Sequence, residues 1–567
     1  MTTKMHENAW EIESVRGTAL APRAYGLPHE PNRPGQRETI EWLRGLPLGT
    51  VAVVSAPTGS GKTSFAAALG HADGRAVALV KTKSLQVENY GSSYRFDVLY
   101  GRGNYDCANP DAIRGATAND CLYSQAMHDC PEADACTYLI AKQAARASRK
   151  ASLNYSYWLT SRWPRHALTE HAEAGRNVSL VMDEAHQLSD VTLDWTSVTV
   201  SMRDRITWEL PPFPVLHGHA RAEDVYLAGQ WLIGAANAVA LAVAPLERKR
   251  ERFADGYADA ALSETEQKTL TAGERLQSKL DAVVEALNTH AGDWYIRSGP
   301  GTLTNGGAPM PGFVARPLTA RYHAPGLFLG KWTSVLMSAT VGDPATFAEE
   351  LGLPAGYVYR DIPNQFSPEQ RPVFTLPAPA MGQKNRDDES ALNEQARVIA
   401  EAIKTCPPAW GGIIHVTRKS EAAALAQRLG RYGIGGRLWT PRATDSTDWA
   451  MREWKQFKRR MRGAIAITWA WWEGYDGVDE QICIVAKTPF PNLADDYERA
   501  RMAYSGTMFL QRTAWNLEQA LGRTRRGRAE DYDAPGERRG LVAIADGNWT
   551  RVQKYMSASL RDAVTSW

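Results

Sequence analysis

The sequence is poor in cysteine, in net charge and in long apolar runs, and each shortage excludes a class of protein. Only six of the 567 residues are cysteine, so the chain is not a small secreted scaffold held together by disulfides. Its formal net charge is +2, which is too small to make the whole surface positive. A nucleic-acid partner would therefore need a local basic groove.

No stretch of the sequence has the pattern of a membrane span or a secretory signal. The most apolar stretch, residues 232–246, is shorter than the roughly 20 residues that cross a bilayer and contains an asparagine and a proline. It predicts a buried helix. The first residues, MTTKMHENAWEIESV, lack the basic start and apolar run of a signal peptide. We therefore expect a cytoplasmic protein, nucleoid-associated if it is prokaryotic or phage-encoded, with no membrane partner.

Most of the few cysteines are grouped in one short window. They are Cys107, Cys121, Cys130 and Cys136. Because a reducing cytosol disfavours disulfides, the group predicts a metal site. Four thiolates are the full ligand set of a [4Fe–4S] cluster. They can also hold zinc, although the close C-x₂₋₄-C pairs of most zinc sites are absent, and the spacing alone leaves both metals open. Cys406 and Cys483 are interpreted as packing residues.

Eight short apolar runs, each bounded by turn residues, predict buried strands. They read TVAVVSAP, AVALVKT, VSLVMDE, SVLMSAT, GGIIHVT, AIAIT, ICIVAKT and LVAIAD. Because the runs are apolar throughout and many helical patterns lie between them, they predict an α/β protein with parallel sheets covered on both faces. The runs fall into two blocks that meet near residue 345.

Two segments interrupt the first block. Residues from about 100 to 155 contain the grouped cysteines. Residues from about 194 to 325 predict mostly helix with few strand runs, and the apolar residues between 276 and 287 follow a 3.6-residue period. The run SGPGTLTNGGAPMPG near the end of this segment is interpreted as a loop.

The run APTGSGKT follows a predicted strand and precedes a predicted helix. It fits the phosphate-binding pattern G-x-x-x-x-G-K-[ST] except that Ala56 replaces the first glycine. Gly59 and Gly61 allow backbone N–H groups to close on phosphate oxygens. Lys62 can neutralise the β- and γ-phosphate charge, and Thr63 can hold Mg²⁺. The run therefore predicts a nucleoside triphosphate site.

The run MDEAH ends another predicted strand. Asp183 is placed to bind Mg²⁺, and Glu184 to orient and deprotonate the attacking water. An Asp-Glu pair at a strand end is often only a helix cap, but together with Lys62 it indicates hydrolysis of the nucleotide.

The run QALGRTRRG supplies positive charge from the second block. Arg523 and Arg526 are three residues apart, so on a helix they share one face. Two guanidiniums from a second lobe can stabilise the charge of a transferring γ-phosphate. Taken alone, this run is most simply interpreted as a solvated basic helix. Together with the other motifs, it is interpreted as a pair of arginines that reach the γ-phosphate.

In their order along the chain, these motifs resemble those of superfamily 2 helicases, and within them those of the iron–sulfur XPD/DinG family. Further runs that resemble family motifs are RPGQ (33–36), KTKSLQVE (81–88), MSAT (337–340), WWEGYDG (471–477) and KTPFPNL (487–493). GRGNYDC (101–107) is similar to the family's lead-in to its first cluster cysteine. The resemblance extends over nearly the whole chain, and it favours a [4Fe–4S] cluster on the four grouped cysteines.

The resemblance implies two RecA-like parallel-sheet domains, the first of which carries an iron–sulfur insertion and a helical arch insertion. The implied boundaries are 1–99, 156–193 and 326–344 for RecA-like domain 1, 100–155 for the iron–sulfur domain, 194–325 for the arch, and 345–567 for RecA-like domain 2.

The resemblance also assigns roles at the nucleotide site. The residues implied to bind or hydrolyse ATP are Gln36, Pro57, Thr58, Gly59, Ser60, Gly61, Lys62, Thr63, Asp183, Glu184, Gly474, Asp476, Gln519, Arg523 and Arg526. Thr63 and Asp183 would hold Mg²⁺. His186, Ser338 and Thr340 would couple hydrolysis to movement along the strand.

Movement along a strand requires phosphate contacts and flat aromatic faces. The candidates are Lys81, Thr82 and Lys83 in the first lobe, Thr417, Arg418 and Ser420 in the second, and Tyr155 and Trp158 for base stacking.

Together these features predict a monomeric ATP-dependent DNA helicase that binds single-stranded DNA and tailed or forked duplexes. The resemblance implies 5′–3′ polarity. An RNA-directed or nucleoprotein-remodelling translocase that does not unwind duplexes stays open, as does an accessory protein that no longer hydrolyses ATP. The intact SGKT, DEAH and arginine motifs argue against the latter. No further domain remains for a fused nuclease.

Overall fold

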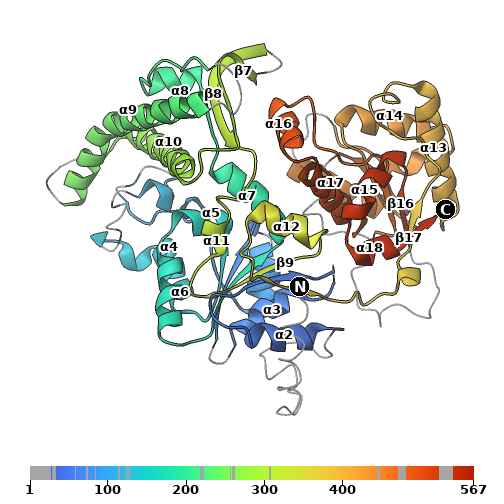
Figure 1. The fold of residues 1–567 in the computed structure, drawn as a ribbon, viewed down its shortest axis with the longest axis horizontal. Coiled ribbons are helices and arrows are strands. Elements are labelled where there is room, and N and C mark those ends of the chain that lie inside the picture. Colours follow the sequence, from blue (N-terminus) through green and yellow to red (C-terminus); the bar gives the residue numbers. More distant parts are fainter. Residues whose placement is uncertain are drawn as a thin grey trace.

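Two parallel sheets and a smaller antiparallel sheet organise the chain (Figure 1). The computed structural model describes residues 27, 33–57, 59–71, 74–83, 85–110, 112, 115–121, 123, 127, 129–216, 222–255, 257, 262–305, 308–442, 447–469, 471, 480–522 and 540–567.

The first lobe is built on a sheet of seven parallel strands in the order β10-β1-β9-β5-β2-β4-β3. These are β1 (Val51–Ser55), β2 (Arg75–Val80), β3 (Asp97–Leu99), β4 (Lys150–Asn154), β5 (Val178–Asp183), β9 (Thr333–Ser338) and β10 (Val358–Asp361). The strands β1, β2, β5 and β9 are buried along their whole length, as expected where helices cover both faces of a sheet.

Helices pack on both faces of this sheet. They are α2 (Gln36–Arg44), α3 (Lys62–Leu69), α5 (Tyr155–Thr160), α6 (Trp163–Glu173), α7 (Leu188–Trp195), α11 (Pro325–Phe328) and α12 (Pro344–Leu351). Alternate strand residues point to opposite faces. Ala52 and Val54 accordingly pack with α2 and α3, whereas Val51 and Val53 belong to the core that includes α5, α6, α7, α11 and α12.

The second lobe repeats this plan with seven parallel strands in the order β13-β14-β12-β15-β16-β11-β17. These are β11 (Val373–Thr375), β12 (Gly412–His415), β13 (Leu438–Trp439), β14 (Ile465–Thr468), β15 (Ile482–Val485), β16 (Leu541–Ile544) and β17 (Val564–Ser566). Its helices are α13 (Glu389–Lys404), α14 (Lys419–Gly430), α15 (Thr447–Arg460), α16 (Asp496–Tyr504), α17 (Gly506–Leu521) and α18 (Ala558–Asp562). All eight apolar runs predicted as strands are therefore strands of these two sheets.

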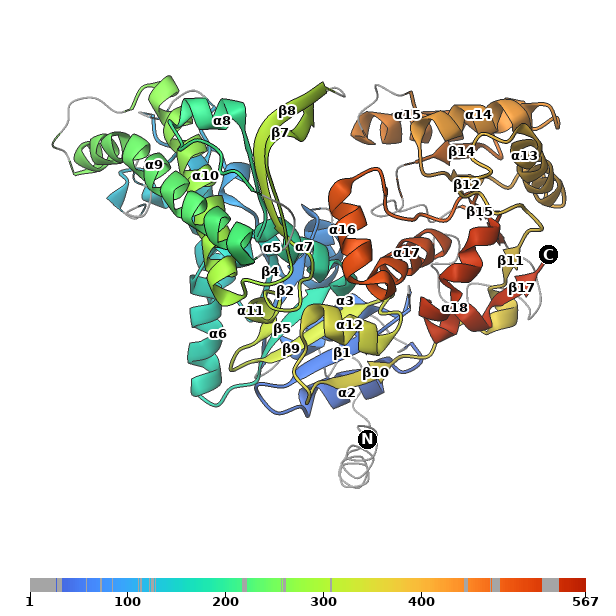
Figure 2. The ribbon, with the colours of Figure 1, turned by 45° about the horizontal axis from the view of Figure 1, so that its top comes forward.

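The arch combines helices with the antiparallel sheet β6-β8-β7. Its elements are β6 (Val198–Ser201), α8 (Met202–Thr207), α9 (Ala222–Ala254), α10 (Glu264–Thr289), β7 (Trp294–Asn305) and β8 (Ala308–Pro317). Ser263 begins α10 with a reciprocal cap, in which its hydroxyl accepts the N–H of Glu266 and the Glu266 carboxylate accepts the N–H of Ser263. Figure 2 shows the β7–β8 hairpin rising between the arch helices and the second lobe.

Helix α9 contains the most apolar stretch of the sequence. By length and composition it is the one helix in the described part of the chain that could cross a membrane. Its apolar residues are divided between two faces. Leu232 and Val239 are buried against the rest of the arch, whereas Leu241 is 76% exposed. The predicted buried helix is therefore buried along one face only.

The segment with the grouped cysteines leaves the first lobe after β3 and returns through α4 (Thr137–Ala147) to β4. It rests on the arch at Asp120. The Gln267 side chain of α10 donates to the Asp120 carbonyl at 2.6 Å, and the Thr271 hydroxyl lies 3.4 Å from the Asp120 carboxylate.

Three predicted features differ from the structure. Strand β10 pairs with β1, so the first lobe extends to Asp361 and the predicted boundary at 344–345 lies too early. Strand β4 belongs to the first sheet, so the cysteine segment ends before Lys150 and not at residue 155. The glycine-rich run interpreted as a loop lies within the β7–β8 hairpin, where the ladder has an irregularity between Gly299 and Leu303 that includes Pro300 and Gly301.

Candidate nucleotide and nucleic-acid site

Three neighbouring strands bring the nucleotide motifs together. Strands β1, β9 and β5 lie side by side and run parallel, so their carboxyl ends meet at one edge of the sheet. The phosphate loop follows β1, Ser338 ends β9, and Asp183 ends β5. Ligands of open parallel sheets bind at this kind of edge.

The phosphate loop has the backbone that an anion site requires. Gly59 and Gly61 have φ of 86° and 83°, a left-handed conformation that favours glycine. Lys62 is the first residue of α3, and its ammonium donates to the Ala56 carbonyl at 3.3 Å. The N-terminal N–H groups of α3 and the Lys62 charge therefore face the same space.

Gln36, which the resemblance implies to bind ATP, lies against this loop. Its amide donates to the Ser64 hydroxyl at 2.7 Å, and its side-chain oxygen accepts the backbone N–H of Arg33 at 3.1 Å. The Arg33 guanidinium in turn donates to the Gly59 carbonyl. Pro57, Ser60 and Thr63 lie on the same loop and helix start, whereas Thr58 lies outside the described residues.

Asp183 is a buried carboxylate held by two hydrogen bonds. The Tyr90 hydroxyl donates to its Oδ2 at 2.9 Å, and the Glu184 N–H donates to its Oδ1 at 2.9 Å. Burial, followed by the charge of Glu184, raises the pKa of Asp183 to about 6, and the Lys62 ammonium opposes this rise. A divalent cation at this position would favour the ionised form, as expected of a Mg²⁺ ligand.

A line of side chains runs from Glu184 across to the second lobe. Glu184 has a left-handed backbone with φ of 52°, and its side chain is 26% exposed, so water can reach it. His186 Nδ1 lies 3.5 Å from a Glu184 carboxylate oxygen and 2.9 Å from the Ser338 hydroxyl. The Ser338 hydroxyl is 3.2 Å from that of Thr340, which accepts from Gln519 of α17 at 3.2 Å.

A small cavity lies beside this line, between the lobes. Its volume is about 100 Å³, and Ser55 and Pro57 of the first lobe line it together with Gln519 of the second. The other residues predicted to reach the nucleotide from the second lobe, Arg523, Arg526, Gly474 and Asp476, lie outside the described residues.

The predicted phosphate-contacting residues are accessible in both lobes. Lys81, Thr82 and Lys83 follow β2 and are exposed. Arg418 and Ser420 follow β12 and are also exposed. Thr417 is partly buried, and its hydroxyl donates to the Glu421 carboxylate at 2.9 Å. Both groups lie at carboxyl ends of strands.

The two predicted stacking residues do not have accessible rings, so that prediction is wrong. Trp158 is 0% exposed, and its indole N–H donates to the Leu327 carbonyl at 2.9 Å. Tyr155 is 3% exposed, and its hydroxyl donates to the Asp183 carbonyl at 2.8 Å. Both rings belong to the core of the first lobe because the start of α5 packs beneath the sheet edge.

The sequence interpretation missed a cavity of about 660 Å³ beside Thr417 and Arg418. Its lining adds Lys487, Phe490 and Arg551. The Arg551 guanidinium lies over the Phe490 ring, 5.1 Å from its centroid. Cationic and aromatic groups of this kind suit a nucleic-acid strand. The run KTPFPNL was the available signal, because it places a lysine and a phenylalanine directly after a buried strand.

The grouped cysteines are all free thiols on one compact segment. Burial raises the pKa of the Cys107 thiol, and the Cys121, Cys130 and Cys136 thiols add to this rise. The Asn109 amide donates to Cys130 Sγ at 3.4 Å, the kind of bond that stabilises a thiolate ligand.

This donor set fits an all-thiolate metal group in number and chemistry. No three of the described histidine, cysteine, aspartate and glutamate side chains, however, are arranged so that they could hold a metal ion as they stand. The [4Fe–4S] assignment therefore stays a prediction.

Comparison with known proteins gives a structural match only. No family model and no curated protein matches the chain. A solved structure described as XPD helicase matches with a TM-score of 0.53 and 12% identity, over 94% of this chain and 98% of that chain. The S. tokodaii Xpd4 structure has a TM-score of 0.49 and 13% identity, over 94% and 98% of the two chains.

The chain has the XPD helicase fold. At this identity the match establishes the architecture, with two RecA-like lobes built on parallel sheets and long insertions in the first. It confirms the two RecA-like parallel-sheet domains expected from the sequence.

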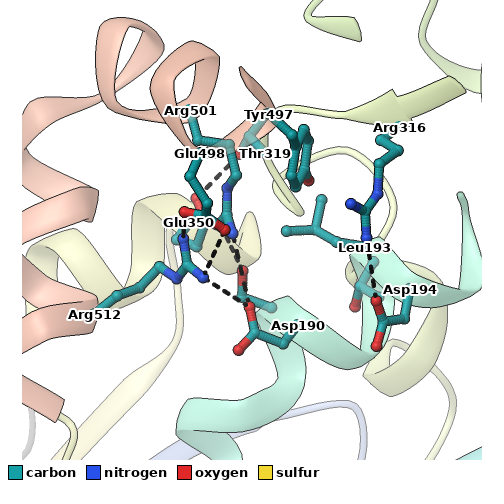
Figure 3. Close-up of polar contacts among 12 residues, drawn as sticks. Asp190, Leu193, Asp194, Arg316, Thr319, Glu350, Tyr497, Glu498, Arg501 and Arg512 are labelled. Atoms are coloured by element: carbon teal, nitrogen blue, oxygen red, sulfur yellow. Dashed lines mark hydrogen bonds and ion pairs between the residues drawn. The ribbon is translucent and has the colours of Figure 1, made fainter. Parts of the chain in front are cut away.

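Within this XPD fold, buried charges join the two lobes (Figure 3). Arg501 of α16 lies 3.3 Å from Glu350 of α12 and 3.7 Å from Asp190 of α7. Arg501 is 5% exposed and Glu350 6%. Glu350 also accepts the hydroxyls of Ser189 at 2.5 Å and Thr319 at 3.2 Å, so both of its oxygens are bonded.

The same helix joins the second lobe to the arch of the XPD fold. The Tyr497 hydroxyl donates to the Pro317 carbonyl at 2.7 Å. The Arg316 guanidinium lies over the Tyr497 ring, 4.4 Å from its centroid (Figure 3). Asp496 pairs with Arg297 of β7. Helix α16 therefore contacts the arch on one side and the first lobe on the other.

We expect Arg501→Met to lower the free energy of unfolding by about 3–5 kcal/mol, because it leaves the Glu350 carboxylate buried without its cation. Denaturant titration would measure the loss. Arg499→Met, on the same helix at a side chain that is 51% exposed, serves as the control and should change stability by less than about 1 kcal/mol. If the two variants had the same free energy of unfolding, the Arg501–Glu350 pair would not stabilise the fold.

Proposed function

We propose that this chain is an ATP-dependent DNA helicase that moves along single-stranded DNA and separates duplexes with 5′–3′ polarity. The observation that carries the proposal is the line of contacts from Glu184 through His186, Ser338 and Thr340 to Gln519. The line consists of a 3.5 Å contact between Glu184 and His186 and three hydrogen bonds that continue to the second lobe. It supports a role for Glu184 beside the phosphate loop. A nucleotide bound there would touch both lobes.

In the proposed reaction, the start of α3 and Lys62 hold the β- and γ-phosphates, and Thr63 and Asp183 would hold Mg²⁺. When bound, the cation neutralises charge on the phosphate oxygens. Glu184 orients the attacking water and takes its proton. Arg523 and Arg526 would approach the γ-phosphate from the second lobe and stabilise the charge that develops during its transfer.

Hydrolysis would change which lobe holds the strand. The γ-phosphate favours the closed arrangement of the lobes, and its loss removes that contribution. Side chains of both lobes form the Gln519–Thr340 contact and the contact of Arg501 on α16 with Asp190 on α7. Opening of the lobes would therefore displace the segment next to His186. The strand itself would contact Lys81–Lys83 and the cavity beside Thr417 and Arg418 alternately.

The four grouped cysteines would hold a [4Fe–4S] cluster, with zinc as the alternative metal. When bound, the cluster would fasten the loops around Cys107, Cys121, Cys130 and Cys136 into one body. That body rests on α10 of the arch through Asp120. In this role the cluster would be structural and would connect the first lobe to the arch.

The direct test is ATP hydrolysis measured with and without single-stranded DNA, beside a strand-displacement assay. DNA-stimulated hydrolysis together with displacement supports the helicase. Hydrolysis stimulated by RNA, or by DNA without displacement, would favour a translocase that does not unwind.

We expect a partial duplex with a 5′ single-stranded tail to be unwound in ATP and Mg²⁺, and one with only a 3′ tail to stay intact. Both insertions lie in the first lobe, so a separating element formed by them would lie beside the lobe that contains Lys62. Binding should weaken steeply between 50 and 200 mM salt, by roughly 10-fold or more, because phosphate contacts release counterions. Better unwinding from the 3′ tail would contradict the polarity.

A further inference from the structure

Two buried tyrosine hydroxyls converge on Asp183, and the proposed reaction uses neither of them. Tyr90 is 0% exposed and donates to the carboxylate, at Oδ2. Tyr155 is 3% exposed and donates to the backbone carbonyl of the same residue. The two bonds are nearly equal in length, at 2.9 and 2.8 Å. They differ in what they hold, because only the Tyr90 bond can fix the rotation of the Asp183 side chain.

Tyr90 reaches Asp183 from an unusual segment. Residues Leu85–Ser92 form a π-helix, a rare conformation that is frequent at functional sites. The exposed residues Lys81–Lys83 lie shortly before this helix, and Thr82 anchors its start by accepting the backbone N–H groups of Leu85 and Gln86.

Contacts with strands β3 and β4 also hold the π-helix in place. The Gln86 amide is fully buried and donates to the carbonyl groups of Leu99 at 3.3 Å and Ser152 at 3.2 Å, on β3 and β4. The Tyr90 ring packs edge-on against Phe96, with the ring centroids 5.1 Å apart. The Tyr90 hydroxyl is therefore held in place by its own surroundings and can act as a fixed donor to Asp183.

We propose that Tyr90 is a positioning residue that fixes the Asp183 carboxylate in the orientation needed to bind the Mg²⁺ of a nucleotide complex. The proposal rests on the proposed ATPase function. The Glu184 N–H holds Oδ1 and Tyr90 holds Oδ2, so the carboxylate plane is fixed on both sides while each oxygen keeps a lone pair for a ligand. Without Tyr90 the carboxylate can turn about its χ2 torsion, and a cation would have to order it on binding.

The Tyr90→Phe variant tests this, because it removes the hydroxyl and keeps the ring that packs on Phe96. Titration calorimetry should measure the affinity for a non-hydrolysable ATP analogue, once with Mg²⁺ and once with a chelator. Partners of metal ligands typically change metal affinity 10- to 100-fold. We expect the gain in affinity from Mg²⁺ to fall roughly 10-fold in Tyr90→Phe, with the metal-free affinity unchanged.

Tyr155→Phe is the matched control, since it removes an equally buried hydroxyl bonded to the same residue through the main chain. In Tyr155→Phe, Mg²⁺ should raise the affinity for the ATP analogue as much as it does in the wild type. An unchanged gain in Tyr90→Phe, or an equal fall in both variants, would overturn the positioning role. A wild-type chain that binds no analogue at all would instead overturn the proposed function. An analogue bound with no benefit from Mg²⁺ would overturn this inference and leave the nucleotide site standing.

Discussion

Replacing Glu184 with glutamine should lower ATP turnover by about 100-fold or more and leave ATP binding close to wild type. The reason is that a neutral amide keeps the shape of the side chain but cannot take the proton of the attacking water. The Glu184 carboxylate lies 3.5 Å from His186 Nδ1. Steady-state phosphate release and equilibrium binding of labelled ATP would measure the two effects separately.

Lys62→Ala should abolish hydrolysis by a different route, because it removes the positive charge at the start of α3 that holds the phosphates. Its ATP affinity should fall together with its turnover. Glu349→Gln, at a side chain that is 72% exposed on α12, is a matched control and should behave as wild type. Near-normal turnover in Glu184→Gln would show that another group activates the water.

Protein purified without oxygen should be brown and contain iron and acid-labile sulfide. Cys121→Ser or Cys130→Ser should remove the colour, because a cluster that loses one of four thiolates loses its full ligand set. These variants should impair strand separation more than nucleotide binding, since the cysteine segment contacts the arch while the phosphate loop lies at the edge of the first sheet. Visible absorption and metal analysis would measure the change.

Cys406→Ser controls for the loss of a thiol as such. Cys406 is buried in the core of the second lobe, so its replacement should leave colour and iron content unchanged. A colourless wild-type protein with one zinc per chain would show that the grouped cysteines hold the other metal.

The central strands of both sheets could be predicted from the sequence, and the edge strands could not. Runs such as VAVVS and ICIVA are apolar at every position because helices cover both of their faces. Strands β4 and β10 read KASLN and VYRD, which are short and partly polar because they lie near or at an edge. Their pairing depends on neighbours that are distant in sequence, and the first-lobe boundary was misplaced for this reason.

The arch hairpin was missed for a related reason. Its strands contain glycine and proline, which normally indicate loops. The pairing of β7 with β8 supplies hydrogen-bond partners for the backbone groups of both strands. The residues that do not fit the ladder lie in the irregularity between Gly299 and Leu303. Only the partner strand makes this run a strand.

The nucleotide motifs were predictable because each depends on local geometry. A glycine-rich turn before a helix, or an acidic pair at a strand end, binds its ligand with groups that are adjacent in the chain. By itself the sequence therefore determined the two parallel sheets, the phosphate loop and the acidic pair. Tertiary structure decided which side chains serve them. It buried Tyr155 and Trp158, which the sequence offered for stacking, and brought Tyr90 to Asp183 and Arg501 to Glu350. These pairings depend on how the lobes and helices pack, and no local pattern of residues encodes the burial or the partner that packing assigns.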